Sequence, residues 1–153
     1  MKKALTLLFL LLSFCLLGCG ESYNVKDDEY NYIKNYGTRT DGNYDAMIVN
    51  SVEEVMKCIN EKTFDVIKNQ EVLKEYDDAF FEEKSLIIVP WVTSSGGDYY
   101  KIKSYKIIGN EIILKIKLTS KGYTCDLGRW FMILEIDSSK IKGVDKIDLN
   151  VNE

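Results

Sequence analysis

The side chains best suited to covalent chemistry in this chain are its four cysteines, Cys15, Cys19, Cys58 and Cys125. The sequence contains no histidine, so no serine or cysteine has an imidazole partner to accept its proton. Conventional nucleophilic triads are therefore excluded, and so is a zinc site built on imidazole. Any chemistry at sulfur must depend on the positions of the cysteines themselves.

Paired carboxylates offer a second kind of chemistry, at Asp77-Asp78 and Glu82-Glu83. A glycoside hydrolase would need two such groups facing each other across a cleft. The spacing around Phe80 and Phe81 is instead typical of the solvated face of a helical turn, with the two rings as core anchors. We therefore predict no catalytic residues, no cofactor and no metal site, and we do not expect an enzyme.

The N-terminal stretch has the pattern of an export signal. Lys2 and Lys3 precede an almost wholly apolar run from Ala4 to Leu17. At about 1.5 Å per residue this run is too short to cross about 30 Å of hydrocarbon as a helix. It has the length of the apolar region of a signal peptide, and it ends directly before Gly18 and Cys19.

The sequence Leu16-Leu17-Gly18-Cys19 resembles the lipobox of bacterial lipoproteins. The resemblance implies that residues 1–18 are a lipoprotein signal peptide and that the Cys19 sulfur carries a diacylglyceryl group. Fatty acyl chains such as palmitate would then hold the protein stably on the extracytoplasmic face of the bacterial cell membrane. The alternative is an ordinary secretory signal in which Cys19 is incidental.

Charge limits the partners of the mature chain. The whole chain has a formal net charge of −4, and removal of Lys2 and Lys3 would make it more negative. An acidic domain argues against nucleic acid as a partner and against electrostatic attachment to anionic lipid. Cys58 and Cys125 remain after processing, and they could form a disulfide or stay as free thiols. Two cysteines are too few for a structural zinc site.

Residues 19–43 are polar and rich in Asn, Asp, Tyr and Lys, so we expect a tether between the membrane and the domain. The alternative is that part of this stretch pairs as an edge strand, which Tyr30, Tyr32 and Tyr36 would allow. Residues 44–153 are expected to form one domain.

The first elements of this domain are a strand at 46–49 and a helix from Val52 to about Asn60. Ser51 and Glu54 have the spacing of a capping box, and the apolar stripe of the helix would include Val55 and Met56. Asp77 or Asp78 would cap a further turn.

From residue 85 the apolar period changes to two. Strands are predicted at 86–92, 99–108, 111–118, 129–137 and 144–151, and the first should be buried on both faces. Pro90 predicts a bulge or an edge there. Residues 94–98 are expected to form a hairpin loop, Gly109-Asn110 a tight turn, and 119–128 a longer loop. These elements predict an α+β fold: an antiparallel β-meander or sandwich-like sheet with one or two helices from the N-terminal half packed on it.

The best candidates for partner binding are Tyr123, Arg129 and Trp130, because Tyr, Arg and Trp dominate protein–protein hot spots. The alternative for Trp130 is a place at the start of a buried strand, with Arg129 at the strand edge. A second functional hypothesis is a small-molecule or glycan binder in which Tyr99, Tyr123 and Trp130 provide stacking surfaces.

From about Tyr76 to Asp148 the order of features is similar to the C-terminal domain of PrcB-type lipoproteins. The shared features are Phe80-Phe81 before Leu86-Ile87-Ile88-Val89, the Ser95-Gly96-Gly97 loop, Tyr99-Tyr100-Lys101-Ile102 and Ile133-Leu134-Glu135-Ile136. PrcB-type proteins associate with a secreted surface protease and help it to assemble. The resemblance implies a protein partner, with a secreted protease as the expected class.

Overall fold

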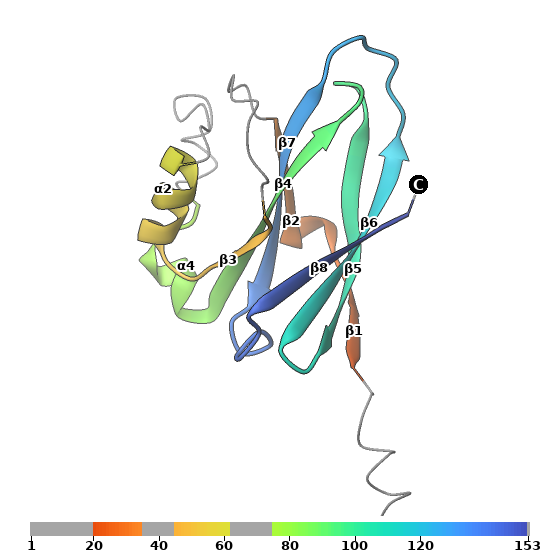
Figure 1. Ribbon diagram of the computed structural model, residues 1–153. Coiled ribbons are helices and arrows are strands. Elements are labelled where there is room, and N and C mark those ends of the chain that lie inside the picture. The colour runs from red at the N-terminus through yellow and green to blue at the C-terminus, as the bar shows by residue number, and fades with distance from the viewer. Residues whose placement is uncertain (1–19, 35–44, 62–74, 153) are drawn as a thin grey trace, which may run out of the picture.

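Two four-stranded sheets pack face to face in the computed structural model, which describes residues 20–34, 45–61 and 75–152 (Figure 1). Sheet A has the strand order β1-β5-β6-β8, and sheet B has the order β2-β7-β4-β3. Sheet A comprises β1 (Glu21–Asn24), β5 (Tyr99–Ile108), β6 (Glu111–Ser120) and β8 (Lys146–Asn152). Sheet B comprises β2 (Tyr30–Lys34), β7 (Gly128–Asp137), β4 (Lys84–Thr93) and β3 (Met47–Val49). A 3-10 turn, η1 (Asp27–Glu29), connects β1 of one sheet to β2 of the other.

The core between the sheets is built from one face of each of the four longest strands. Alternate residues form that face on β4, β6 and β7, and on β5 a register shift between Ile102 and Ser104 interrupts the alternation. The buried members on these strands are Ile87, Val89, Ile102, Tyr105, Ile112, Leu114, Ile116, Met132, Leu134 and Ile136. The strand predicted at 111–118 is present as β6, and Ile112, Leu114 and Ile116 on its inner face are completely buried.

A second apolar cluster covers the outer face of sheet B, beneath helices α2 (Val52–Glu61) and α4 (Asp78–Glu83) (Figure 1). Its members are Val49, Val55, Tyr76, Leu86, Ile88, Phe131 and Ile133, with Met47, Phe80 and Phe81 packed at its margin. Strand β4 is therefore buried on both faces, as its continuous apolar run predicts. The α+β fold class is confirmed, in its sandwich-like form with helices on one face.

Both helix starts follow their sequence signals. The amide of Glu54 donates to Ser51 Oγ over 3.2 Å, and Glu54 Oε2 accepts from the amide of Asn50 over 2.7 Å. Asp77 caps α4 by accepting from the amide of Phe80 over 2.9 Å. The predicted apolar stripe of α2 is wrong at Met56, which is 41% exposed. Val55 is buried in the outer cluster, and the next position lies about 100° further round the helix and faces solvent.

The expected tether of residues 19–43 is wrong for the part that the structure describes. Glu21 pairs with Ile107 of β5 and Tyr30 pairs with Leu134 of β7, so residues 21–34 contribute one strand to each sheet. Tyr23 stacks on Tyr105 with ring centroids 4.9 Å apart. Tyrosine rings supply the buried apolar surface in this polar stretch, and the edge-strand alternative is the correct one for β2. Residues 35–44 lie outside the described part.

The expected hairpin at residues 94–98 is also wrong, because β4 lies in sheet B and β5 in sheet A. Residues 121–127 likewise cross between the sheets, from β6 to β7. The β5–β6 turn at Gly109-Asn110 is the predicted tight turn, with φ of 61° at Gly109. Strand β8 pairs with β6 in parallel, which corrects the all-antiparallel expectation, because the intervening β7 serves as the crossover.

Pro90 marks an edge, with no register shift against β7. Within the described residues, β3 pairs with β4 only from Leu86 to Ile88, so Pro90 lies beyond that pairing. A proline needs such a position because it has no N–H to donate to a second neighbour.

The strand directions give the sandwich two distinct ends. The loop end carries the two crossing loops, residues 94–98 and 121–127, at the top of Figure 1. The N-terminal end carries Gly20, the Gly109-Asn110 turn and the β7–β8 connection at 138–145, at the bottom of Figure 1. The chain therefore enters the sandwich at the end opposite the crossing loops.

Candidate interaction site at the loop end

The hydroxyl of Ser95 connects the two crossing loops. Ser95 Oγ accepts hydrogen bonds from the amide of Thr124 over 3.0 Å and from the amide of Gly97 over 3.3 Å. Ser95 Oγ and Thr124 Oγ1 lie 2.9 Å apart, and Thr124 Oγ1 also accepts from the Gly97 amide over 3.1 Å. The Gly97 amide is thus shared between the two hydroxyl oxygens, and either hydroxyl can donate to the other. Ser95 is 8% exposed whereas Thr124 is exposed, so this network is partly buried.

Two further bonds hold the loops together. Asp98 Oδ1 accepts from the amide of Gly122 over 2.9 Å, and Asp98 is only 5% exposed. The amide of Gly96 donates to the carbonyl of Asp126 over 2.8 Å. A buried carboxylate needs such donors, since an uncompensated buried charge is costly. Asp98 therefore has a structural role as a link between the loops.

Gly97 and Gly122 bring the backbones of the two loops into direct contact, with no room for a side chain between them. A Cβ atom built on Gly122 would lie 2.2 Å from Gly97 Cα, and one built on Gly97 would lie 2.8 Å from Gly122 Cα. Only glycine fits at both positions, for a steric reason. The two crossing loops thus form one rigid unit, which we call the loop pair (residues 94–98 and 121–127).

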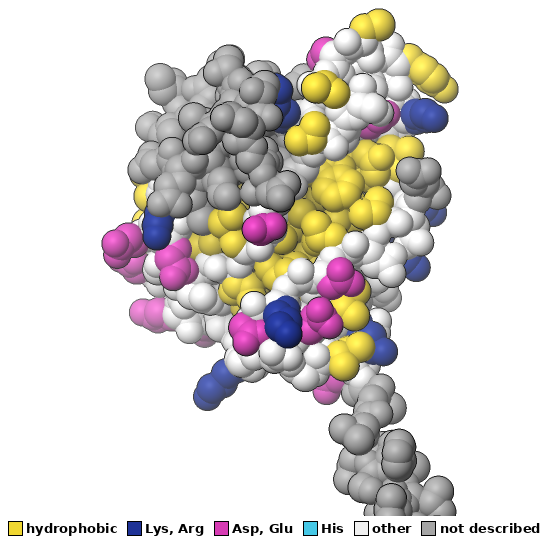
Figure 2. Space-filling model, in the orientation of Figure 1, with side chains coloured by type: hydrophobic (Ala, Val, Ile, Leu, Met, Phe, Trp, Pro, Cys, Tyr) yellow, Lys and Arg dark blue, Asp and Glu magenta, His cyan; other side chains and the backbone are white. Residues whose placement is uncertain are grey.

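Large side chains project from this unit into solvent. Tyr123 is 90% exposed and Leu127 is 59% exposed, and the thiol-bearing Cys125 is exposed between them. Val92 and Tyr99, at the adjoining strand ends, are 51% and 39% exposed. Figure 2 shows the corresponding separate hydrophobic side chains around the top of the molecule. The loop end therefore combines a fixed backbone with exposed apolar groups.

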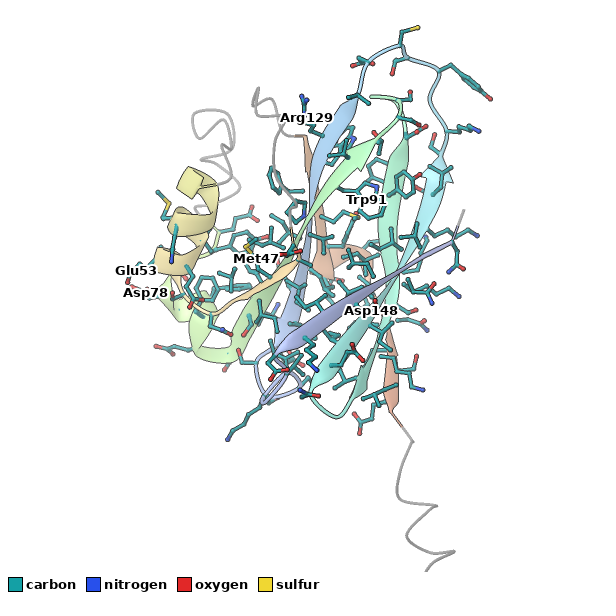
Figure 3. The ribbon with its side chains drawn as sticks, in the orientation of Figure 1. Met47, Glu53, Asp78, Trp91, Arg129 and Asp148 are labelled. Carbon is teal, nitrogen blue, oxygen red and sulfur yellow. The ribbon has the colours of Figure 1, made fainter. Side chains whose placement is uncertain are left out.

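The three residues predicted for partner binding lie on different surfaces. Tyr123 is on the loop pair, whereas Arg129 and Trp130 are half-buried in β7. Trp130 lies opposite Trp91 of β4, whose ring packs against the core between the sheets, so both rings are on the inner face. Arg129 shares the outer face with Phe131, and Figure 3 shows it at the upper end of β7.

For Trp130 the alternative is correct: it lies near the start of the buried strand β7 rather than on an exposed loop. Its ring nitrogen is buried, and a Cβ on Gly128 would approach that nitrogen to 2.7 Å. Tyr99, Tyr123 and Trp130 therefore do not form one exposed stacking face. This placement counts against the glycan-binding arrangement in which all three rings stack on a ligand.

The acidic pairs of α4 are not arranged as a catalytic pair. Asp77 is used as the helix cap, and Asp78, Glu82 and Glu83 are exposed on the helix. Figure 3 shows Asp78 at the side of the molecule, away from the loop pair. Among the residues that the structure describes, no group of three or more Cys, Asp or Glu could hold a metal ion.

Shifted pKa values occur at structural ion pairs rather than at the loop pair. A hydrogen bond from Lys101 lowers the pKa of Asp27, and a hydrogen bond from Lys140 lowers that of Asp137. Burial raises the pKa of the Tyr105 phenol, which lies in the core. The Lys101–Asp27 pair stabilises η1, and the Lys140–Asp137 pair stabilises the β7–β8 connection. Neither pair includes a residue of the loop pair.

Cys125 is a free, exposed thiol, so the structure does not contain the Cys58–Cys125 disulfide. Cys58 belongs to α2, and its side chain lies outside the described set. The choice between a disulfide and two free thiols in the mature protein therefore stays a prediction. Lipidation at Cys19 concerns a residue that the structure does not describe.

Sequence reasoning missed the residues that build the loop pair, namely Ser95, Gly97, Asp98, Gly122 and Thr124. Their signal is small and polar residues at matched positions in two loops, which becomes informative only when both loops are known to meet. Comparison with protein-family models, curated protein sequences and solved structures found no match. Within the described ranges, no helix has the length and apolar character needed to cross a bilayer.

Proposed function

We propose that this chain is a lipid-anchored, non-enzymatic extracytoplasmic lipoprotein whose loop pair binds a protein partner. The single observation that carries the proposal is the exposure of Tyr123, at 90%, on a backbone held by partly buried hydrogen bonds. A secreted protease is the partner class, from the resemblance of residues 76–148 to PrcB-type domains. Regulation or assembly of that protease is the corresponding role.

Rigidity is what distinguishes this surface from an ordinary loop. Binding costs free energy when loops and side chains become ordered, and a preorganised surface avoids most of that cost. The Ser95–Thr124 and Asp98–Gly122 bonds fix the backbone on both sides of Tyr123 before any partner arrives. Tyrosine has few rotatable bonds and a large apolar ring, which makes it an effective anchor.

Orientation supports the same proposal. Gly20 and β1 lie at the N-terminal end of the sandwich, and the loop pair lies at the other end. Strand β5 spans this length with 10 residues, about 33 Å at about 3.3 Å per residue. An anchor at Cys19 would therefore present the loop pair away from the membrane, within reach of an extracellular protein.

Photo-crosslinking from two positions tests the proposal. A benzophenone amino acid replaces Tyr123 at the loop end in one variant and Asn110 at the N-terminal end in the other, both in the full chain in its native membrane. We expect a discrete protein adduct from position 123 and none of the same mass from position 110. An adduct pattern that is identical at the two positions, or no protein adduct at 123, would contradict partner binding by the loop pair.

Affinity isolation from detergent-solubilised membranes provides the matched measurement. Tyr123→Ala should reduce recovery of the crosslinked partner about tenfold or more, since truncating a hot-spot side chain costs about 2 kcal/mol or more. Lys121→Ala alters an exposed neighbour on the same loop and should leave recovery unchanged. Equal recovery with Tyr123→Ala would count against the proposed site.

A further inference from the structure

Gly20, the first described residue, lies in close contact with the end of β5. A Cβ on Gly20 would lie 2.6 Å from the carbonyl oxygen of Ile107, 2.7 Å from Ile108 Cγ1 and 2.7 Å from Lys106 Cε. The next residue, Glu21, is already paired with Ile107 in sheet A. Gly20 is thus packed against the end of β5, and only one peptide bond separates it from Cys19. If Cys19 carries lipid, the lipid begins at the surface of the folded domain.

The surface at this point carries an exposed apolar side chain. Ile108 is 40% exposed, and among the described residues it is the large exposed hydrophobic residue that lies at the N-terminal end. The others are Met56 on α2, Val92, Tyr99, Tyr123 and Leu127 at the loop end, and Val151 near the end of β8. Ile108 therefore lies beside the entry point of the chain.

The turn that presents Ile108 is firmly held. Gly109 adopts φ of 61°, and Asn110 Nδ2 donates to Asp145 Oδ1 over 2.7 Å. The amides of Asp145 and Lys146 both donate to the carbonyl of Asn110, over 3.0 and 3.2 Å. The β5–β6 turn and the β7–β8 connection consequently form one surface.

Charges at this end are mixed. Basic Lys106, Lys142 and Lys146 are accompanied by acidic Glu21, Glu111 and Asp145. This surface has no strong electrostatic attraction for an anionic bilayer, and no strong repulsion from one. Contact with lipid would depend on the acyl chains and on the apolar side chain.

We propose that the N-terminal end of the sandwich, defined by Gly20, Ile108, Gly109 and Asn110, rests directly on the lipid surface. This inference depends on the proposed acylation of Cys19. Because Gly20 is packed, the anchor holds this end at the headgroups, and Ile108 enters the interface. The domain is then fixed upright, with the loop pair at the far end of the sandwich, rather than swinging on a tether.

Spin-label accessibility tests this orientation. A nitroxide is attached through a ketone-bearing amino acid at position 108, or at position 123 as the control, in the acylated full chain. The protein is reconstituted into phosphatidylethanolamine–phosphatidylglycerol vesicles. We expect collisions with a water-soluble nickel chelate to be several-fold rarer at position 108 than at 123, and collisions with oxygen to be more frequent.

A linker variant tests whether the short connection between Cys19 and Gly20 holds position 108 at the lipid surface. Inserting about ten Gly/Ser residues between Cys19 and Gly20 adds a flexible spacer of roughly 17 Å on average. We expect this spacer to restore nickel access at position 108 while position 123 stays unchanged. Equal nickel access at 108 and 123 in the chain without the linker would overturn the seating proposal.

Mass spectrometry of the N-terminal peptide distinguishes the two proposals. A diacylglyceryl mass on Cys19 together with full nickel access at position 108 would refute seating while the anchor stands. An unmodified Cys19 would refute the anchor, and the seating proposal with it. Acylated Cys19 with protected position 108 supports both.

Discussion

Replacing Gly122 by alanine should separate the two crossing loops. The positive φ angles among the described glycines are at Gly109 and Gly143, so the backbone at Gly122 accepts an alanine without strain. The obstacle is steric: the new Cβ would lie 2.2 Å from Gly97 Cα and 2.3 Å from the Gly97 carbonyl carbon. Carbon atoms in contact are about 3.5 Å apart, so the loops must separate by roughly 1.3 Å.

A separation of this size stretches the bonds that hold the loop pair. Asp98 Oδ1 and the Gly122 amide are 2.9 Å apart, and the Gly97 amide and Thr124 Oγ1 are 3.1 Å apart. Overpacking costs about 1–3 kcal/mol, and each net hydrogen bond contributes about 1 kcal/mol. Since surface loops can adjust, we expect the free energy of unfolding to fall by about 2 kcal/mol. Against a typical total of about 5–15 kcal/mol, the variant should still fold.

Urea denaturation followed by tryptophan fluorescence measures this change, because Trp91 and Trp130 lie in the strands that lead to the loop pair. Lys121→Ala, at the exposed neighbouring position, is the matched control and should stay within about 0.5 kcal/mol of the parent chain. Hydrogen exchange should also accelerate at the amides of Gly96 and Thr124. A Gly122→Ala variant with parental stability and unchanged exchange would refute a rigid loop pair.

Three further predictions concern the scaffold. Gly109→Ala should lower the free energy of unfolding by about 1–2 kcal/mol because of the left-handed backbone, whereas Gly109→Asn should lose much less; thermal denaturation of the two variants makes the comparison. Ser51→Ala should cost about 1 kcal/mol by removing the acceptor for the Glu54 amide, and Ser51→Thr should restore most of it in the same assay. Burial raises the pKa of Tyr105 above its usual value of 10.0, so its contribution to stability is complete below about pH 10 and is lost as the pH rises through the raised pKa. Tyr105→Phe should therefore flatten the fall in unfolding free energy measured by urea titrations above about pH 10, and an unchanged pH slope would count against burial of the phenol.

Local pattern explains why most elements could be predicted. The β6 alternation of Ile112, Leu114 and Ile116 against lysines specifies both a strand and its buried face. The Ser51 and Asp77 caps follow from side-chain chemistry that acts within one helical turn. Such signals need no knowledge of the rest of the chain.

Connections between strands could not be predicted in the same way. Residues 94–98 have the length of a hairpin loop, but loop length does not say whether the next strand pairs with its predecessor or crosses to a facing sheet. Residues 21–34 looked like a tether because polar residues dominate, whereas Tyr23 and Tyr30 supply the buried surface of two short strands. Pairing over long sequence separation determines both outcomes.

At the loop end, too, local features could be predicted from the sequence and contacts between distant segments could not. An exposed Tyr123 follows from its place between small and polar residues in a long loop. Trp130 could face either way, since a strand that is apolar on both faces leaves its direction open. The burial of Ser95 and Asp98 depends on the second loop, and neither loop alone contains that information.

The intact mass of the protein recovered from bacterial membranes decides whether the chain is anchored through a lipid on Cys19. We expect a chain that begins at Cys19, with a diacylglyceryl group on its sulfur, and a Cys19→Ala variant that leaves the membrane fraction. A mature chain that retains Met1, or one that has an unmodified thiol at Cys19 and stays in the membrane fraction, would contradict it.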